Sequence, residues 1–182
     1  MFIKPDVPFR QQWLPTTVIV GAVSLLVPIY LTVYGQRHDA VATTLNEMAQ
    51  TFFTLGEGYR LNMWDVGGQK TIRAYWRNYF EATDGIIWVV DSADPIRLRD
   101  CAKELWDLLD AERLAGATLL VMANKQDIPT ALSMDSIKET LSLDDISSRH
   151  WAIFPVSAIT GKGLEEAVDW LVDDISGRVF MG

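Results

Sequence analysis

Three uninterrupted apolar runs of strand length constrain the fold of this 182-residue chain more than any other feature. They cover residues 85–91, 118–123 and 151–156, and helical patterns separate them. A strand without a polar face must be covered on both sides, which is typical of parallel sheets with helices above and below. The sequence therefore predicts an α/β fold with a mostly parallel sheet and helices on both faces.

The helical patterns have recognisable ends. Asp94 followed by Pro95 is a helix cap and first-turn pair, and the helix that it begins is predicted to continue to Gly116. Ser133 begins a shorter helix, and residues 163–180 form the last one. The last helix has a single apolar stripe, made of Leu164, Ala167, Val168, Leu171, Val172 and Ile175.

Upstream of these elements, two short β-rich runs, residues 52–55 and 59–64, surround a Gly-Glu-Gly sequence and predict a hairpin. The charge is concentrated in the same part of the chain. Residues 1–50 carry three basic and three acidic groups, so the whole net charge of −8 lies in residues 51–182. Nucleic acid is therefore not an expected partner, because phosphate backbones are held by clustered Lys and Arg. A lone cysteine, Cys101, excludes a disulfide framework and indicates a reducing compartment.

Residues 1–50 form an atypical apolar segment. No charged residue lies between Arg10 and Arg37, and residues 16–35 are about long enough to cross a bilayer as a helix. The alternative is a buried strand of a folded core, which the β-branched run 16–20 favours. Hydropathy alone leaves both interpretations open. A secretory signal is disfavoured because the apolar run is longer than such signals usually are.

Polar residues follow the predicted strands at three places. In a parallel sheet, ligands bind at the carboxyl ends of the strands, so these residues are predicted to meet at one site. They are Asp65-Val66-Gly67-Gly68-Gln69 after the hairpin, Asn124-Lys125-Gln126-Asp127 after the 118–123 run, and Ser157-Ala158 after the 151–156 run.

In this order, these three groups resemble the nucleotide site of small GTPases, and Trp64 before Asp65 makes the resemblance specific to the Arf and Arf-like family. The resemblance covers roughly residues 51–180, and runs such as 76–81 are most similar to the Arf-like protein 2 branch. It implies an Arf-like GTPase domain over residues 51–182, a switch that binds and hydrolyses GTP. The implied cofactors are GTP or GDP and Mg²⁺. The implied partners are tubulin-folding cofactors or lipid-cargo carriers, and the implied location is the cytoplasm.

The guanine-side residues have a clear chemical logic. Asp127 can accept two parallel hydrogen bonds from guanine, whereas adenine would leave the carboxylate without partners. Asn124 can brace the loop and face the base edge. The neighbouring Gln126 is counted with it among the nucleotide-binding residues. The methylene stem of Lys125 can lie along the ring with its ammonium in water. Ala158 would offer its backbone N–H to the guanine oxygen, with Ser157 positioning that loop.

At the phosphate end, the N–H of Gly68 can approach a γ-phosphate because no Cβ intervenes. By the resemblance, Gln69 orients the attacking water and Asp65 helps to hold Mg²⁺ through a water.

One family feature has no counterpart in the chain. Phosphoryl-transfer enzymes of this class use a Gly-Lys-Ser/Thr sequence at their phosphate loop, and here the one Gly-Lys pair, Gly161-Lys162, is followed by glycine. We therefore expect the first strand and the phosphate loop to be replaced by the apolar segment, with residues 17–27 able to fill the strand's place. Nucleotide binding by this chain is then in question.

Three hypotheses follow. The chain is an Arf-like GTPase; or it is a non-catalytic interaction protein that keeps a surface with Tyr75, Trp76 and Tyr79; or it is tethered to a membrane by residues 16–35.

Overall fold

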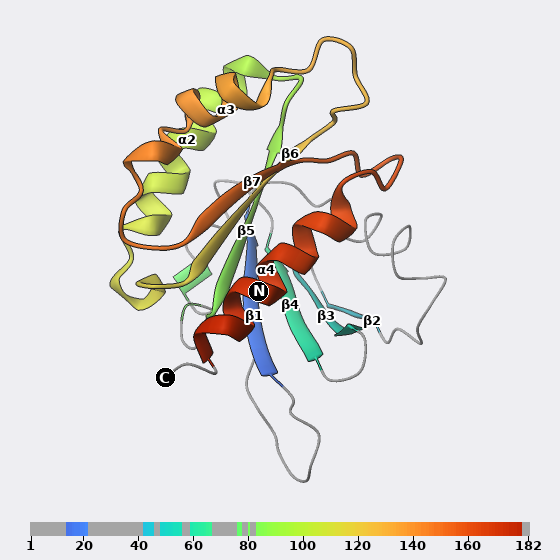
Figure 1. Cartoon of the computed structure of the whole chain (residues 1–182), viewed down its shortest axis with the longest axis vertical. Coiled ribbons are helices and arrows are strands. Elements are labelled where there is room, and N and C mark those ends of the chain that lie inside the picture. The colour runs from blue at the N-terminus through green and yellow to red at the C-terminus, as the bar shows by residue number, and fades with distance from the viewer. Residues whose placement is uncertain are drawn as a thin grey trace, which may run out of the picture.

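The computed structural model describes residues 14–21, 42–45, 48–55, 59–66, 76–77, 80 and 83–179. Within them, seven strands form one sheet in the order β2-β3-β4-β1-β5-β6-β7 (Figure 1). The strands are β1 (Leu14–Gly21), β2 (Ala42–Leu45), β3 (Met48–Leu55), β4 (Tyr59–Val66), β5 (Gly85–Asp91), β6 (Thr118–Asn124) and β7 (Trp151–Pro155). The helices are α2 (Pro95–Leu109), α3 (Met134–Thr140) and α4 (Leu164–Val179), with 3₁₀ turns η2 (Glu112–Leu114) and η3 (Leu143–Asp145).

The beginning of the apolar amino-terminal run is a strand. β1 lies between β4 and β5 and is parallel to both, with Val18 opposite Met63 on one side and Gly85 on the other. A membrane helix over residues 16–35 is therefore wrong for residues 16–21, because the backbone of β1 is paired with both neighbours in the sheet. Residues 22–35 lie outside the described part of the chain. Across the described residues, no helix combines the length and hydropathy needed to cross a bilayer.

The predicted hairpin is confirmed. β3 and β4 pair in antiparallel fashion over their whole lengths, with Leu55 opposite Tyr59 next to the turn. Both strands extend beyond the predicted runs, and β2 adds an antiparallel strand at the edge. This hairpin places the end of β4 beside the end of β1.

The three apolar runs form β5, β6 and β7, which pair in parallel. Successive side chains of a strand point to opposite faces. Ile86, Trp88 and Val90 of β5 pack in one core cluster with buried residues of α2 and α3. Ile87 and Val89 are equally buried and point to the other face, where α4 crosses the sheet (Figure 1). Helices on both faces thus explain why β5 and β6 are apolar throughout, whereas β7, at the end of the sheet, is only partly buried.

α2 and α3 begin where the sequence predicts, but α2 ends earlier than predicted. Asp94 caps α2, and its carboxylate accepts the Arg97 N–H at 3.0 Å. Ser133 caps α3 in the same way, accepting the N–H of Ser136 at 3.2 Å. α2 ends at Leu109 instead of Gly116, because Ala111 is extended (φ −70°, ψ 113°) and the chain then forms the separate turn η2.

At the amino ends of the parallel strands, Asp174 connects α4 to the sheet. Its carboxylate accepts hydrogen bonds from Thr118 Oγ1 at 2.7 Å and pairs with His150 Nδ1 at 2.8 Å, and Arg178 lies beside it. Burial alone would raise the pKa of Asp174, but the hydrogen bonds from Thr118 and His150 and the charges of His150 and Arg178 outweigh it and hold the pKa below its ordinary value. This cluster ties α4 to the starts of β6 and β7.

Candidate functional site

The five parallel strands bring their carboxyl ends to one edge of the sheet. Asp65 lies one residue before the end of β4 and pairs with Val20 of β1. Asp91 and Asn124 end β5 and β6 and lie opposite each other. Three strand spacings separate β4 from β6, so the edge between Asp65 and Asn124 extends over about 14 Å. Asp65 and Asn124, one from each half of the predicted site, therefore belong to a single edge.

Asn124 joins two loops at this edge. Its side chain is buried, and Oδ1 accepts two backbone hydrogen bonds, from the Lys125 N–H at 2.8 Å and from the Ala158 N–H at 2.9 Å. The first donor belongs to the loop after β6 and the second to the loop after β7. Since a buried N–H without an acceptor is costly, this one oxygen holds the loops in a fixed relation.

The loop after β6 turns sharply and leaves Asp127 on the surface. Lys125 adopts a left-handed conformation with φ +70°. Gln126 is used structurally, because its N–H donates to the Val156 carbonyl at 3.1 Å and its side-chain amide donates to the Leu132 carbonyl at 3.2 Å. Asp127 is exposed, and within the described residues its carboxylate has neither a hydrogen bond nor an ion pair. Asp127 can therefore accept hydrogen bonds from a ligand.

The loop after β7 is closed by Ser157, which is almost fully buried. Its Oγ accepts the Thr160 N–H at 3.2 Å, and its carbonyl accepts the Gly161 N–H at 2.8 Å. Ala158 follows, with its N–H already donated to Asn124. A guanine oxygen that binds this N–H must share it with Asn124, a competition that the sequence does not reveal.

Sequence analysis missed Asp91 as a site residue. Its Oδ2 lies 2.5 Å from Lys125 Nζ, and its Oδ1 accepts the Ala93 N–H at 3.0 Å. The Lys125 ammonium, expected in water, is thus half-buried in an ion pair. The position of Asp91 at the end of an apolar run was the signal that could have found it, because the same rule identified Asn124.

The phosphate end is only partly described. Asp65 is placed at the edge by its backbone, whereas Gly68 and Gln69 lie outside the described residues. In the described part of the chain, no group of three or more His, Cys, Asp or Glu side chains is arranged to hold a metal. Mg²⁺ in nucleotide sites usually takes one or two carboxylates and completes its shell with phosphates and water. A single carboxylate from Asp65 fits that mode of binding.

Comparisons with known proteins agree with this arrangement. Residues 35–175 match the ADP-ribosylation factor family, Arf. The ADP-ribosylation factor-like protein 2 of Drosophila melanogaster is 56% identical over 146 residues, which are 80% of this chain and 78% of that protein. The protein of the same name from Arabidopsis thaliana is 53% identical over 154 residues, or 84% and 82% of the two chains.

The fold has a counterpart among solved structures. The Arl6 BBS3 small GTPase of Trypanosoma brucei, solved with the nucleotide analogue GppNp, superimposes with a TM-score of 0.77 at 26% identity. The match covers 90% of this chain and 98% of that one. The predicted small-GTPase-like fold is therefore confirmed, and so is the resemblance to Arf-like proteins.

Proposed function

The chain is a member of the ADP-ribosylation factor family, and from this premise we propose that it acts as a guanine nucleotide switch that binds GDP and GTP and hydrolyses GTP. One observation carries the proposal. The double hydrogen bond to Asn124 Oδ1 holds the loops of Asp127 and Ala158 against each other at the ligand-binding edge of the sheet. Two loops fixed in this way can read one planar base from two sides.

The described residues fit a guanine base. Asp127 supplies two acceptor oxygens for the ring N–H and the exocyclic amine. The ion pair with Asp91 holds Lys125 at the edge, so that its aliphatic stem can cover the ring. Ala158 supplies a backbone donor for the guanine oxygen, shared with Asn124. Adenine would leave the Asp127 carboxylate without partners, which gives the site its preference for guanine.

At the phosphate end we assign Asp65 to the Mg²⁺ shell through a water, Gly68 to the γ-phosphate through its N–H, and Gln69 to the attacking water. Mg²⁺, when bound, neutralises the charge that develops on the phosphates. Gln69 orients the water, and Gly68 allows close approach because it has no Cβ.

Nucleotide titration of the complete chain tests this proposal. Fluorescent GDP should bind in the presence of Mg²⁺, and ATP should not displace it. Asp127→Asn replaces one acceptor by a donor, which suits xanthine and opposes guanine. We expect at least about thirtyfold weaker GDP binding, corresponding to about 2 kcal/mol, together with improved binding of xanthosine diphosphate.

The matched control is Asp145→Asn, an exposed aspartate on η3. It should leave both affinities within twofold of the unmodified chain. Equal effects of the two substitutions would reject the assignment of Asp127 to the base.

A second candidate function is a non-catalytic interaction module. The sequence favours it because no Gly-Lys-Ser/Thr segment is present to hold the β- and γ-phosphates. Charge-assisted hydrogen bonds contribute about 1.5–3 kcal/mol each, so the loss of several weakens binding by orders of magnitude. Failure of the purified chain to retain GDP or GTP in Mg²⁺ supports this candidate, and micromolar or tighter binding rejects it.

A more specific proposal, about cellular location and partner proteins, rests on the resemblance to Arf-like protein 2. We propose action in the cytoplasm on partners of that branch, such as tubulin-folding cofactors or lipid-cargo carriers. Purified partners of each kind should bind the GTP-loaded chain more tightly than the GDP-loaded chain. A partner that binds both forms equally is not under switch control.

A further inference from the structure

The Lys125 side chain is fixed at both of its ends by contacts within the chain. At the backbone end, its N–H donates to Asn124 Oδ1 at 2.8 Å and its carbonyl accepts the Ile128 N–H at 3.0 Å. At the other end, Nζ lies 2.5 Å from Asp91 Oδ2. The methylene stem between these two ends therefore crosses the ligand edge from the end of β6 to the end of β5.

The conformation of Lys125 depends on these contacts. Its φ of +70° is unfavourable for a residue with a Cβ. Such a conformation persists only where the surrounding structure determines it, and it is frequent at ligand sites. The side chain is still 40% exposed, whereas that of its partner Asp91 is 24% exposed. A ligand at the edge can therefore reach a stem whose position is already set.

Asp91 is itself held by the turn that leads from β5 into α2. Its Oδ1 accepts the Ala93 N–H at 3.0 Å, and its carbonyl accepts the Asp94 N–H at 3.3 Å. One carboxylate oxygen thus fixes the turn, and the other meets Lys125. The two oxygens have different tasks, which substitutions can separate.

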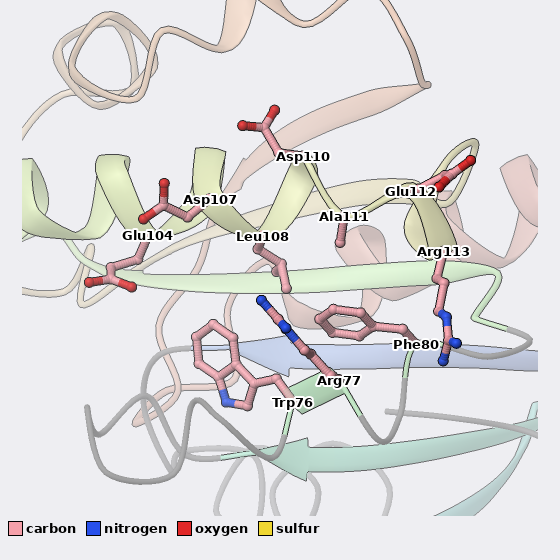
Figure 2. Close-up of a pocket in the computed structure, with 10 residues that line it drawn as sticks. All are labelled: Trp76, Arg77, Phe80, Glu104, Asp107, Leu108, Asp110, Ala111, Glu112 and Arg113. Atoms are coloured by element: carbon pink, nitrogen blue, oxygen red, sulfur yellow. The ribbon is translucent and has the colours of Figure 1, made fainter.

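α2 gives this turn a rigid support. Leu108 of α2 points toward the rings of Trp76 and Phe80, and all three side chains are more than nine-tenths buried in one core cluster (Figure 2). Trp76 also packs edge-to-face on Trp88 of β5, with the ring centres 6.1 Å apart. The two elements that meet at the Asp91 turn, β5 and α2, are therefore fixed to each other.

We infer that Asp91 is a positioning residue that presets the Lys125 stem for a purine ring and raises affinity without choosing the base. This role rests on the proposed function, since both concern the same site. The stem covers the face of a ring, whereas the choice of guanine depends on the ring edge that Asp127 meets. Ordering a lysine side chain costs rotamer entropy, and the ion pair with Asp91 places that cost in folding instead of in binding.

Titration of the complete chain in Mg²⁺ with fluorescent GDP, displaced by inosine diphosphate, tests the inference. Inosine diphosphate has the same ring system as GDP but lacks the exocyclic amine. Asp91→Asn should bind both nucleotides about five- to tenfold more weakly, because Lys125 must then be ordered on binding. The ratio of the two dissociation constants should stay within about twofold of that of the unmodified chain, whereas Asp127→Asn should lower the preference for GDP.

The matched control is Asp94→Asn in the same turn. It removes an ion pair with Arg97, of 3.3 Å, that does not involve Lys125, and asparagine still caps α2. Its affinity for GDP should stay within about twofold of that of the unmodified chain.

A second substitution at Asp91 separates positioning from a purely structural role. Asp91→Asn keeps an oxygen for the Ala93 N–H but loses the charge, whereas Asp91→Glu keeps the charge and moves it away from Ala93. Asp91→Glu should therefore retain GDP affinity within about threefold, while Asp91→Asn loses it. The reverse pattern would identify Asp91 as a turn residue only. Either variant decides alone if the other does not fold, which circular dichroism shows.

A double-mutant cycle tests whether Asp91 acts through Lys125. Lys125→Met keeps an apolar stem without the ammonium. In this background Asp91→Asn should change GDP affinity by less than about twofold, because the ion pair is already broken. Equal losses with and without the ammonium would overturn the inference.

The outcomes distinguish this role from the proposed function. If the unmodified chain binds GDP and Asp91→Asn binds it equally well, the positioning role is rejected and the nucleotide switch stands. A changed ratio of the two dissociation constants in Asp91→Asn also rejects it, because Asp91 would then take part in choosing the base. If the unmodified chain binds neither nucleotide, both proposals fail.

Discussion

Asn124 shows how much of the site depends on one side-chain atom. Its Oδ1 satisfies two backbone donors from loops that are more than thirty residues apart in sequence. The Asn124 side chain is almost fully buried, so it has a structural role in addition to any contact that its amide makes with a base. A substitution here disturbs stability and ligand binding together.

We predict that Asn124→Ala lowers the free energy of unfolding by about 2–4 kcal/mol, because two buried N–H groups lose their acceptor. Urea denaturation measures the change. Asp127→Ala, on the exposed side of the same loop, should alter stability by less than about 0.5 kcal/mol. A loss below about 1 kcal/mol for Asn124→Ala would show that water or a neighbouring group replaces the amide.

At the residue scale, the sequence predicts which side chains belong to the site better than it predicts which of them interact with each other. The strand-end rule selected Asn124, Lys125 and Ala158, and in the structure the backbone N–H groups of Lys125 and Ala158 both donate to the Asn124 side chain. It did not select Asp91, whose partner Lys125 lies on another strand end. An ion pair between distant residues depends on strand order, which a single sequence does not specify.

At the scale of elements, the residue directly before α4, Gly163, occupies a position that requires glycine. Gly163 has φ +76°, and a Cβ at this position would lie 2.3 Å from the carbonyl oxygen of Pro155. Gly116 has nearly the same φ but no neighbour within 4 Å of a Cβ. Substitution of Gly163 would therefore add a steric clash to the backbone strain, whereas substitution of Gly116 would cause the strain alone.

We predict that Gly163→Ala destabilises the protein by at least about 2 kcal/mol more than Gly116→Ala, which costs only the strain of a left-handed residue, about 1 kcal/mol. Thermal and urea denaturation measure both variants. Gly177→Ala, in open space within α4, should instead stabilise by about 0.5–1 kcal/mol and calibrates the comparison. Equal losses for Gly163 and Gly116 would show that Pro155 moves away without cost.

Strands were predicted well where both of their faces are covered, because such strands consist almost entirely of apolar residues. Residues 85–91 form β5 as predicted, since both faces of that strand are covered. The end of α2 was predicted wrongly at Gly116, because the apolar spacing continues past Leu109 while Ala111 takes an extended conformation. Periodicity reports which face is buried but does not show where the backbone leaves the helix.

At the scale of the whole molecule, the cluster around Asp174 fastens the last helix to the sheet. Thr118 and His150 hold its carboxylate from β6 and from the residue before β7. Arg178 also donates to the Gly116 carbonyl at 2.7 Å and to the Asp84 carbonyl at 3.2 Å. Protonation of Asp174 would weaken several of these connections at once.

The pKa of Asp174 gives this cluster a defined pH dependence. Because the folded-state pKa lies below the unfolded value of about 3.9, the stabilisation is present above about pH 4 and is lost as the pH falls through the lower folded-state value. We predict that Asp174→Asn destabilises the protein most above about pH 4 and progressively less in more acidic solution. Urea denaturation from about pH 2.5 to 5.5 tests this, with Asp145→Asn as control. A difference that grows on acidification would contradict the assignment.

The overall sheet was predictable only in part. The strands after residue 51 followed from the sequence, whereas the amino-terminal run allowed either a strand or a membrane helix. Hydropathy cannot separate the two, because the centre of a sheet covered on both faces is as apolar as a bilayer. Residues 14–21 form a strand, because they pair with β4 from Tyr59 onward and with β5 from Gly85 onward.

The central position of β1 also has a consequence for biosynthesis. This strand leaves the ribosome before both of its neighbours, since Leu14 pairs with Tyr59 and Val18 with Gly85, which are translated much later. Closing such long loops costs entropy before any contact compensates it, and folding that depends on distant pairing is slow. The middle of the sheet is thus completed only after β5 has been synthesised. Until then β1 lacks one of its two neighbouring strands, and its unpaired edge is open to capture by chaperones or by other nascent chains.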